Sequence, residues 1–463
     1  MSIKYREEKD SIGTMQVPAD AYYGVQSLRA KENFKITGRC SHIELVRGLV
    51  EIKIAAAITN AEAGVFSNEI KDAIVQAGKE ALEGKFDDQF IVDSIQGGAG
   101  TSLNMNANEV LANRAIEILG GVKGDYSIVH PNDHVNCGQS TNDAYPSAGK
   151  LATIRLLQKA IVELKRLEDA FEDCAKRFKH VVKMGRTEMQ DAVPMSLGQS
   201  FGAFAKAIGR DVRRFEVAIE AMSVLNMGAT AIGTGINADP KYIKNIVKNV
   251  SKVTGLKLSQ ADDLIDATQN IDEFANVSGI VKICAIDLSK ISNDLRLMSS
   301  GPRAGFNEIN LPGRQNGSSI MPGKVNPVMP EVMSQICFNI IGNDMTITMA
   351  AEGGQLELNA FEPIIFHCLF ESLDTLRNGV AGFIDYCVSG ITANEDICRE
   401  SVENSIGIVT SLCPYIGYTD SARIAKRALK EGRKVYDVIL EENIMPKEEV
   451  DKIFEQVIND VIG

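Results

Sequence analysis

Apolar residues recur at spacings of three and four through the middle of the chain, which is the pattern of amphipathic helices. Such runs cover residues 147–180, 197–222 and 274–298, and two further helical stretches cover about 330–351 and 362–389. Each run is much longer than the average helix, which has about 11–12 residues. Long helices with narrow apolar seams pack side by side at shallow angles. The pattern therefore predicts a mainly α fold with a long central bundle of five helices.

Helices of this length leave much apolar surface to cover, so we expect the bundle to pack against further copies of the chain. The alternative is a monomeric five-helix bundle. We expect three domains: a mixed, mostly helical one at 1–140, the long-helix bundle at 141–393 and a small helical one at 394–463. Almost no strand pattern occurs, and no Gly-rich nucleotide fingerprint follows a strand, which argues against a cofactor-dependent lyase.

The composition narrows the choice of partners and compartment. A net charge of -12 disfavours nucleic acid and anionic membranes, so an anionic substrate needs local positive groups. The first residues, MSIKYREEKDSIG, lack the apolar segment of a signal peptide, and no apolar run is long enough to span a membrane. Nine cysteines without metal-ligand spacing predict buried free thiols in a reducing cytosol. We therefore expect a cytoplasmic protein without a catalytic metal.

Four polar clusters that contain glycine interrupt the helical pattern. The first three are expected at loop-to-helix transitions, with Thr101, Ser140 to Asn142 and Thr187 at N-cap positions. Capping alone is one interpretation of each. A helix N-terminus also offers free N–H groups and partial positive charge, so the three ends together would suit a carboxylate ligand. The clusters are QGGAGTSLNMNANEV (96–110), HVNCGQSTNDAYP (134–146), KMGRTEMQDAVP (183–194) and GPRAGFNEINLPGRQNGSSIMPGKVNPVMPE (301–331).

The fourth cluster contains GSSIMPGKVNP, which starts at Gly317. One interpretation is a flexible loop between helices, where Gly and Pro are ordinary. The other is a proton-abstracting unit, because Ser318 stands six residues before Lys324. A serine acts as a base only when its oxyanion is stabilised, and backbone N–H groups or an adjacent ammonium would do this. Pro327 is expected in the first turn of the next helix.

In this order, the four clusters resemble the shared regions of the aspartase/fumarase superfamily, of which GSSIMPGKVNP is the signature. The resemblance covers nearly the whole chain, from PADAYYGVQSLRA onward. It implies a homotetramer in which five helices from each subunit form a twenty-helix core. It also implies that each active site is built from three subunits, which would explain why the polar clusters are scattered along the sequence.

Within the superfamily, the sequence resembles the aspartases, which convert L-aspartate reversibly to fumarate and ammonia, more than the class II fumarases. Fumarases usually have Gln where this chain has Ser102. They also tend to have PRCG where this chain has PRAG, so that Ala304 stands in place of the cysteine. NDAYP, NEINLP and NPVMPE are also similar to aspartase sequences. One alternative is a class II fumarase, which interconverts malate and fumarate. Another is a non-catalytic structural tetramer, against which the intact Ser318, Lys324 and Asn326 argue.

The resemblance also implies roles for individual residues. Ser318 would remove the proton next to the β-carboxylate to give an enediolate (aci-carboxylate), and ammonia would leave by anti-elimination. Lys324 is the second expected catalytic residue, and the loop that carries both is expected to be a mobile lid. The matching substrate-binding residues are Thr101, Ser140, Thr141 and Ser319 for the β-carboxylate, Lys324 and Asn326 for the α-carboxylate, and Asn142 and Thr187 near the amino group.

Glu188 departs from the family, which commonly has His or Gln directly after the threonine that matches Thr187. Its carboxylate either faces the substrate ammonium, which would favour aspartate over malate, or pairs with a neighbouring Lys or Arg. His130 and His134 lie in a region that resembles the superfamily's secondary carboxylate site, although a polar turn near a helix start explains them equally well. We expect no cofactor, and activation by a divalent cation such as Mg²⁺ stays open.

Overall fold

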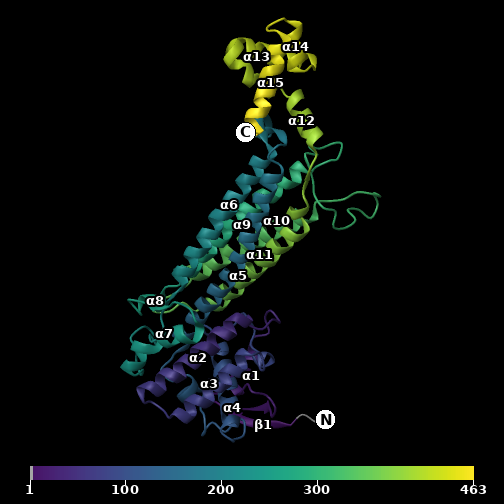
Figure 1. The fold of residues 1–463 in the computed structure, drawn as a ribbon. Coiled ribbons are helices and arrows are strands. Elements are labelled where there is room, and N and C mark those ends of the chain that lie inside the picture. Colours follow the sequence, from purple (N-terminus) through teal and green to yellow (C-terminus); the bar gives the residue numbers. More distant parts are fainter. Residues whose placement is uncertain (1–3, 463) are drawn as a thin grey trace. The chain divides into compact units, whose positions relative to one another are not determined.

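The computed structural model describes residues 4–462 and consists mainly of helices (Figure 1). All five long helices that the apolar pattern predicts are present, and a mainly α fold is therefore confirmed. The first begins six residues earlier than the run at 147, because the polar Ser140–Asn142 cluster already forms its first turn. The five are α5 (Thr141–Arg177), α6 (Leu197–Met222), α9 (Asp272–Met298), α10 (Val328–Glu352) and α11 (Glu362–Tyr386).

The described residues also contain eight short strands, which the sequence did not predict. They form four two-stranded sheets, of which only the third is parallel. Strands of two to seven residues contain too few alternations to give a period-2 signal. The pairs are β1 (Tyr5–Lys9) with β2 (Thr14–Pro18), β3 (Val182–Thr187) with β4 (Gln190–Ser196), β5 (Val224–Leu225) with β6 (Ser259–Gln260), and β7 (Ile309–Asn310) with β8 (Thr392–Ala393).

The chain divides into two compact units, and each long helix contributes one stretch to each of them. The first unit comprises Met1–Ile161, Arg213–Ile283 and Asn339–Thr375. The second comprises Val162–Val212, Cys284–Phe338 and Leu376–Gly463. The domain boundaries that we expect at 140 and 393 stay a prediction.

In the first unit, α2 forms the centre of a group of shorter helices. It contacts α3, α4 and α7, and its sequence IKIAAAITNA places small residues where these neighbours approach. Gly48 of α2 also lies against α5, where an added Cβ would be 2.8 Å from the Ala148 carbonyl oxygen. The shorter helices are α1 (Val25–Asn33), α2 (Ile43–Ala63), α3 (Asn68–Leu82), η1 (Asp87–Gln89), α4 (Thr101–Ile118), η2 (Pro131–Val135), α7 (Pro240–Thr254) and α8 (Asp266–Gln269).

Aromatic rings connect the long-helix stretches of the first unit. The Phe366 ring of α11 lies 5.2 Å from that of Tyr145 on α5 and 5.0 Å from that of Phe274 on α9. All three side chains are buried. Ser278 of α9 donates a hydrogen bond to Asp344 of α10. The buried rings thus join α5, α9 and α11, and the hydrogen bond adds α10 to this end of the bundle.

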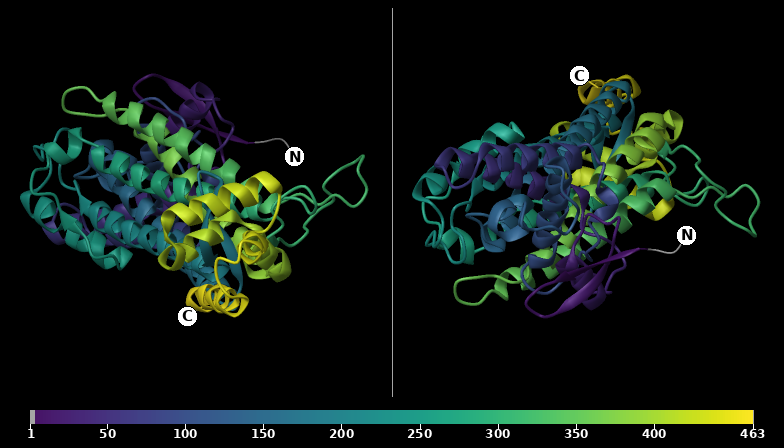
Figure 2. Two further views of the ribbon diagram at one scale, coloured as in Figure 1. Left: turned by 90° about the horizontal axis from the view of Figure 1, so that it is seen from above. Right: turned by 90° about the horizontal axis from the view of Figure 1, so that it is seen from below.

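In the second unit, the C-terminal helices pack on the β3–β4 hairpin. Val182 and Met184 of β3 share a core with Val402, Ile408 and Leu412. In Figures 1 and 2 the green loop before α10 projects away from the helices of this unit. The remaining elements are η3 (Val388–Gly390), α12 (Glu395–Asn404), η4 (Ile406–Leu412), α13 (Cys413–Glu431), α14 (Val435–Glu441) and α15 (Lys447–Ile462).

Two expectations from composition concern thiols and membranes. All nine cysteines are free, and six are buried; Cys40 is exposed, and Cys137 and Cys413 are half-buried. The prediction of buried free thiols is therefore confirmed for six positions. None of the helices in residues 4–462 combines the length and the apolar character that crossing a bilayer requires.

Candidate active site

Four of the predicted site residues lie in the first unit, where α4 and α5 begin side by side. Thr101 is the first residue of α4 and is exposed, but Gly100 occupies the N-cap position, so the N-cap prediction for Thr101 is wrong. Gly100 has a φ of 86° and lies against the Tyr145 ring, where a Cβ would be only 2.5 Å away. A side chain at this cap is therefore excluded by space as well as by backbone conformation.

The start of α5 is fixed by its own polar residues. Ser140 caps the helix, because its Oγ accepts a hydrogen bond from the Asn142 N–H at 3.2 Å. Asp143 is fully buried and accepts hydrogen bonds from the backbone N–H groups of Ser140, Gly228 and Thr230 at 2.9–3.1 Å. Burial raises the pKa of its carboxyl to about 6, and these hydrogen bonds oppose the shift. Asp143 thereby ties residues 228–230 to the helix start.

The orientation of the Asn142 amide follows from one hydrogen bond. Its Nδ2 donates to the Ala231 carbonyl oxygen at 2.7 Å. The amide oxygen is therefore directed the other way, and within the described part of the chain it has no donor. An amide oxygen is an acceptor only, so it suits a positively charged donor such as an ammonium group.

Thr187 and Glu188 lie in the second unit, at the tip of the β3–β4 hairpin. Thr187 is the last residue of β3, so the prediction that it caps a helix is wrong. Glu188 and Met189 form the two-residue turn, with φ values of 51° and 66°. Such a turn requires positive φ at both central residues, and most hairpins use Asn or Gly there. The strained turn presents both Thr187 and Glu188 to solvent.

The base of this hairpin is held by a buried carboxylate. Glu308 is completely buried and pairs with Lys183 at 2.8 Å and with Arg186 at 2.6 Å. The Arg186 guanidinium also covers the Phe306 ring, 4.3 Å from its centroid. Glu188, by contrast, makes no ion pair with any residue that the structure describes. The alternative in which Glu188 pairs with a neighbouring Lys or Arg of its own chain therefore has no support.

The loop that carries Ser318 is closed at its base and exposed at its tip. The Gly317 N–H donates to the Lys324 carbonyl oxygen at 2.8 Å, and Asn326 Nδ2 donates to the Gly317 oxygen at 2.8 Å. A Cβ on Gly317 would be 2.6 Å from the Lys324 oxygen, so the closure requires glycine. Helix α10 begins at Val328, one residue after Pro327, so Pro327 precedes the first turn instead of lying in it.

The Ser318 hydroxyl oxygen accepts two backbone hydrogen bonds within this loop. The donors are the N–H groups of Ile320 at 3.1 Å and Met321 at 2.9 Å. Two N–H groups directed at one oxygen stabilise negative charge on it, as in an oxyanion hole. The loop thus supplies backbone donors of the kind that a serine base requires. The Lys324 ammonium is not among the groups that donate to the Ser318 hydroxyl oxygen.

Lys324 and Asn326 line a cavity of about 720 Å³ in the second unit, together with Arg296 and Ser300. The Lys324 ammonium makes no ion pair with any residue in 4–462, so its charge is available to a ligand. Thr187 is absent from the residues that line this cavity, and Glu188 lines a different one of about 530 Å³. Within its own unit, the hairpin therefore does not contribute to the cavity of Lys324.

His130 and His134, just before and at the start of the second cluster, stabilise a turn. His130 Nδ1 accepts hydrogen bonds from the N–H groups of Asn132 and Asp133, both at 3.2 Å, at the start of η2. His134 Nδ1 accepts from the His130 N–H at 2.8 Å, and burial lowers the pKa of His134. These contacts match the interpretation as a polar turn. No group of three or more His, Cys, Asp or Glu side chains in the described chain is placed to hold a metal ion.

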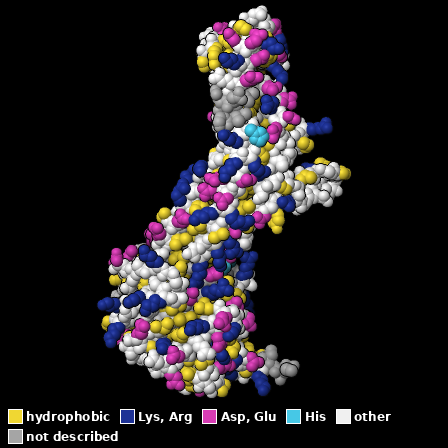
Figure 3. Space-filling view, viewed as in Figure 1, with side chains coloured by type: hydrophobic (Ala, Val, Ile, Leu, Met, Phe, Trp, Pro, Cys, Tyr) yellow, Lys and Arg dark blue, Asp and Glu magenta, His cyan; other side chains and the backbone are white. Residues whose placement is uncertain are grey.

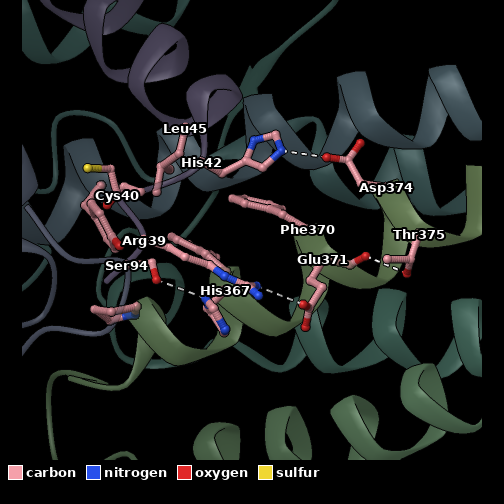
Figure 4. A pocket seen from close by; sticks show the side chains of 14 residues that line it. Arg39, Cys40, His42, Leu45, Ser94, His367, Phe370, Glu371, Asp374 and Thr375 are labelled. Atoms are coloured by element: carbon pink, nitrogen blue, oxygen red, sulfur yellow. Dashed lines mark hydrogen bonds and ion pairs between the residues drawn. The ribbon is translucent and has the colours of Figure 1, made fainter. Parts of the chain in front are cut away.

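A further pocket in the first unit contains none of the predicted site residues (Figure 4). Its volume is about 230 Å³, and Tyr145, Phe366 and Phe370 line it. Three hydrogen-bonded side-chain pairs around this pocket connect residues between 39 and 94 to α11. The pocket residues therefore have a structural role. The pairs are Arg39 with Glu371 at 3.2 Å, His42 with Asp374 at 2.8 Å and Ser94 with His367 at 3.0 Å.

Sequence reasoning missed the buried groups beneath the start of α5. Lys53 and Asn104 lie on α2 and α4, and Asn104 Nδ2 donates to the Thr141 hydroxyl oxygen at 3.1 Å. A charged residue inside the apolar run EIKIAAAI was the one available signal for Lys53. Asn104 lies inside the first polar cluster at 96–110, but nothing in the sequence distinguished it from the other polar residues of that cluster.

Comparison with known proteins agrees with the motifs. The family model described as Lyase matches residues 13–342, and the one described as Fumarase C C-terminus matches residues 408–456. The aspartate ammonia-lyase of Bacillus subtilis (strain 168) is 51% identical over 450 residues, which cover 97% of this chain and 95% of that protein. The aspartate ammonia-lyase of Helicobacter pylori (strain J99) is 53% identical over 451 residues, which cover 97% and 96%.

Solved structures show the same relationship at the level of the fold. The crystal structure of fumarate lyase:delta crystallin from Brucella melitensis bound to cobalt has a TM-score of 0.96 and 45% sequence identity, and the match covers 99% of both chains. Sequence and fold thus agree over nearly the full length. The chain therefore belongs to the aspartase/fumarase superfamily of lyases.

Proposed function

We propose that this protein is a carbon–nitrogen lyase that eliminates ammonia from L-aspartate to give fumarate, reversibly. The observation that carries the chemistry is the Ser318 hydroxyl oxygen, which accepts hydrogen bonds from the N–H groups of Ile320 and Met321. Identities of 51–53% to aspartate ammonia-lyases over 97% of the chain support aspartate as the substrate. The same base would serve a fumarase, so the leaving group is the part that the test must decide.

In the proposed reaction, deprotonated Ser318 takes a proton from the substrate Cβ. The electron pair of the C–H bond moves into the β-carboxylate and gives a doubly charged enediolate. The pair then returns to form the C=C bond while the C–N bond breaks, and the ammonium group leaves as ammonia. Because the substrate carboxylate itself accepts the electrons, the reaction needs no cofactor.

The side chains around the helix starts suit this charge movement. Hydroxyl groups of Thr101, Ser140, Thr141 and Ser319 would donate to the β-carboxylate, where negative charge grows. Donors preorganised at such a position contribute strongly, and the loss of one costs about 10²–10³ in rate. Lys324 and Asn326 would hold the α-carboxylate, and the unpaired Lys324 ammonium supports this assignment.

The amino group of the substrate would lie near Thr187, Glu188 and Asn142. The Asn142 amide oxygen is directed away from Ala231, because Nδ2 donates to the carbonyl oxygen of that residue, and it accepts no hydrogen bond from residues 4–462. The Glu188 carboxylate is exposed and unpaired among the described residues. Both groups are hydrogen-bond acceptors, and an ammonium group offers only donors. This complementarity favours aspartate over malate, whose hydroxyl is neutral.

We also propose that the active protein is a homotetramer whose sites are shared between three subunits. Helix α10 carries an apolar stripe of Ile341, Met345 and Met349, which are 37%, 63% and 68% exposed. Residues four apart lie on one helix face, and exposed apolar faces mark interaction surfaces. Figure 3 shows further hydrophobic side chains between charged ones on the face that it draws. A bundle of four subunits would cover the stripe.

The function is tested by the absorbance of fumarate formed from L-aspartate and from L-malate. We expect fumarate from aspartate only, and production from malate alone would contradict the proposal. Ser318→Ala should lower kcat by about 10²–10⁴, the usual contribution of a general base. Ser401→Ala is the matched control, because its hydroxyl donates only to the Ile397 carbonyl of its own helix. Equal kcat in the two variants would exclude Ser318 as the base.

A further inference from the structure

Lys53 lies in the middle of α2, and the proposed reaction does not use it. Its side chain is completely buried, and burial lowers the pKa of its ammonium to about 7, while the Asp143 carboxylate opposes the shift. A buried charge is costly unless hydrogen bonds surround it. Its three acceptors are amide oxygens: Asn104 Oδ1 at 2.7 Å, Asn136 Oδ1 at 2.8 Å and Gln139 Oε1 at 2.9 Å.

The ammonium determines how the neighbouring amides are oriented, because a charged lysine can only donate. Asn104 must present its oxygen to Lys53, and its Nδ2 therefore faces the other way. From there, Nδ2 donates to the Thr141 hydroxyl oxygen at 3.1 Å. Thr141 thus acts as an acceptor toward Asn104, and its own hydroxyl hydrogen stays available to another partner.

We propose that Lys53 is a positioning residue: through Asn104, it keeps the Thr141 hydroxyl as a hydrogen-bond donor to the substrate carboxylate. The inference rests on the proposed function, in which Thr141 binds the β-carboxylate. Without the ammonium, the Asn104 amide can turn over, and Thr141 would then donate to the amide oxygen. The enediolate would lose a donor at the carboxylate on which its charge accumulates.

The amides of Asn136 and Gln139 are oriented by the same ammonium. Asn136 Oδ1 accepts from Lys53 and also from Asn104 Nδ2 at 3.1 Å, while its own Nδ2 donates to the Gln139 carbonyl oxygen. Gln139 Nε2 donates to the Val135 oxygen at 3.0 Å. Each amide therefore directs its oxygen at the ammonium, while its nitrogen donates to a further acceptor: the Thr141 and Asn136 oxygens for Asn104, and backbone carbonyl oxygens for Asn136 and Gln139. Such a network has one consistent set of donors and acceptors while Lys53 is charged.

A double-mutant cycle separates this role from a purely structural one. Lys53→Met removes the charge at similar length, and Thr141→Val removes the hydroxyl at similar shape. We expect Lys53→Met to lower kcat/KM for aspartate about 10- to 100-fold in the wild-type background. In the Thr141→Val background, where no hydroxyl remains to be oriented, the further loss should be less than about threefold. Equal factors in both backgrounds would overturn the proposal.

A second variant keeps the test decisive if Lys53→Met does not fold. Asn104→Asp is nearly isosteric and still accepts from Lys53, but it can no longer donate to Thr141. It should lower kcat/KM by a similar factor with an unchanged Tm. The matched control is Asn106→Asp, also buried on α4, whose side chain bonds Gln89 and Ile91 instead. Wild-type kcat/KM in Asn104→Asp, or an equal loss in Asn106→Asp, would overturn the proposal.

The same measurements distinguish this inference from the function on which it rests. If the wild-type protein forms no fumarate from aspartate, the proposed function itself is wrong. If it forms fumarate and the two substitutions act independently, only the role of Lys53 is wrong.

Discussion

At the scale of single residues, the candidate site depends on which groups can donate and which can accept. A hydrogen bond to the Ala231 carbonyl oxygen orients the Asn142 amide. The Ser318 hydroxyl oxygen accepts hydrogen bonds from two backbone N–H groups. The sequence predicts which residue types gather near a carboxylate. It could not predict these orientations, because the partners that impose them come from distant segments or from the local loop backbone.

Glu188 gives a prediction at this scale. If its carboxylate faces the substrate ammonium, Glu188→Gln replaces a charge-assisted hydrogen bond by a neutral one, which is roughly half as strong. KM for aspartate should therefore rise at least about fivefold, with a smaller change in kcat. The measurement is steady-state fumarate formation at several aspartate concentrations.

The control for Glu188 is a second glutamate that is equally open to solvent. Glu400 lies on α12, and Glu400→Gln should leave KM at the wild-type value. An unchanged KM in Glu188→Gln would show that this carboxylate does not contact the substrate.

At the scale of elements, α1 shows how distant residues complete a helix. Its N-cap, Gly24, has no side chain, and the free N–H groups of Gly24, Gln26 and Ser27 donate to Glu109 of α4 at 2.8–3.1 Å. Ser27 Oγ donates to the same carboxylate. Most of the cap of α1 therefore comes from a residue more than 80 positions away, and the Val25 N–H donates to Glu8 at 2.9 Å. Local cap signals could not reveal it, just as they misplaced Thr187 in a helix start.

The buried cap makes stability depend on pH. Burial raises the pKa of Glu109 from 4.5 to about 7, against its hydrogen bonds. The folded protein thus binds a proton more tightly than the unfolded chain, so this contribution to stability is full below pH 4.5 and is lost as the pH rises through 7. Tm should fall between pH 5 and pH 7.5 by more in the wild type than in Glu109→Gln.

That comparison is made by thermal unfolding of both proteins in buffers of equal ionic strength. Glu117→Gln on the same helix controls for a general change of charge, because Glu117 is only partly buried and pairs with Arg114. If the wild type and Glu109→Gln show the same change of Tm with pH, Glu109 does not titrate in this range.

At the scale of the whole molecule, the apolar stripe of α10 is left uncovered in a single chain. Helix length and apolar seams already predict further copies of the chain, and the exposed Met345 and Met349 mark the face of α10 at which we propose that these copies bind. A site assembled from several subunits would also account for hairpin and lid residues that line different cavities.

Met345→Glu tests the proposed tetramer, because it places a charge in the middle of the apolar stripe of α10. We expect a particle smaller than a tetramer by light scattering coupled to size-exclusion chromatography, and a parallel loss of activity. Met345→Leu keeps the side chain apolar and should retain both mass and activity. A wild-type protein that is monomeric and active would refute the shared site.

The sequence by itself determined the long helices, the superfamily and the position of the loop that starts at Gly317, since apolar periodicity and the GSSIMPGKVNP motif are local properties of the chain. It also placed Ser140 correctly at a helix start. Only the tertiary structure decided the strands, the hairpin under Thr187 and Glu188, and the buried Lys53 beneath Thr141. These depend on hydrogen bonds and close approaches between segments far apart in the sequence, and such contacts leave no periodic signal along the chain.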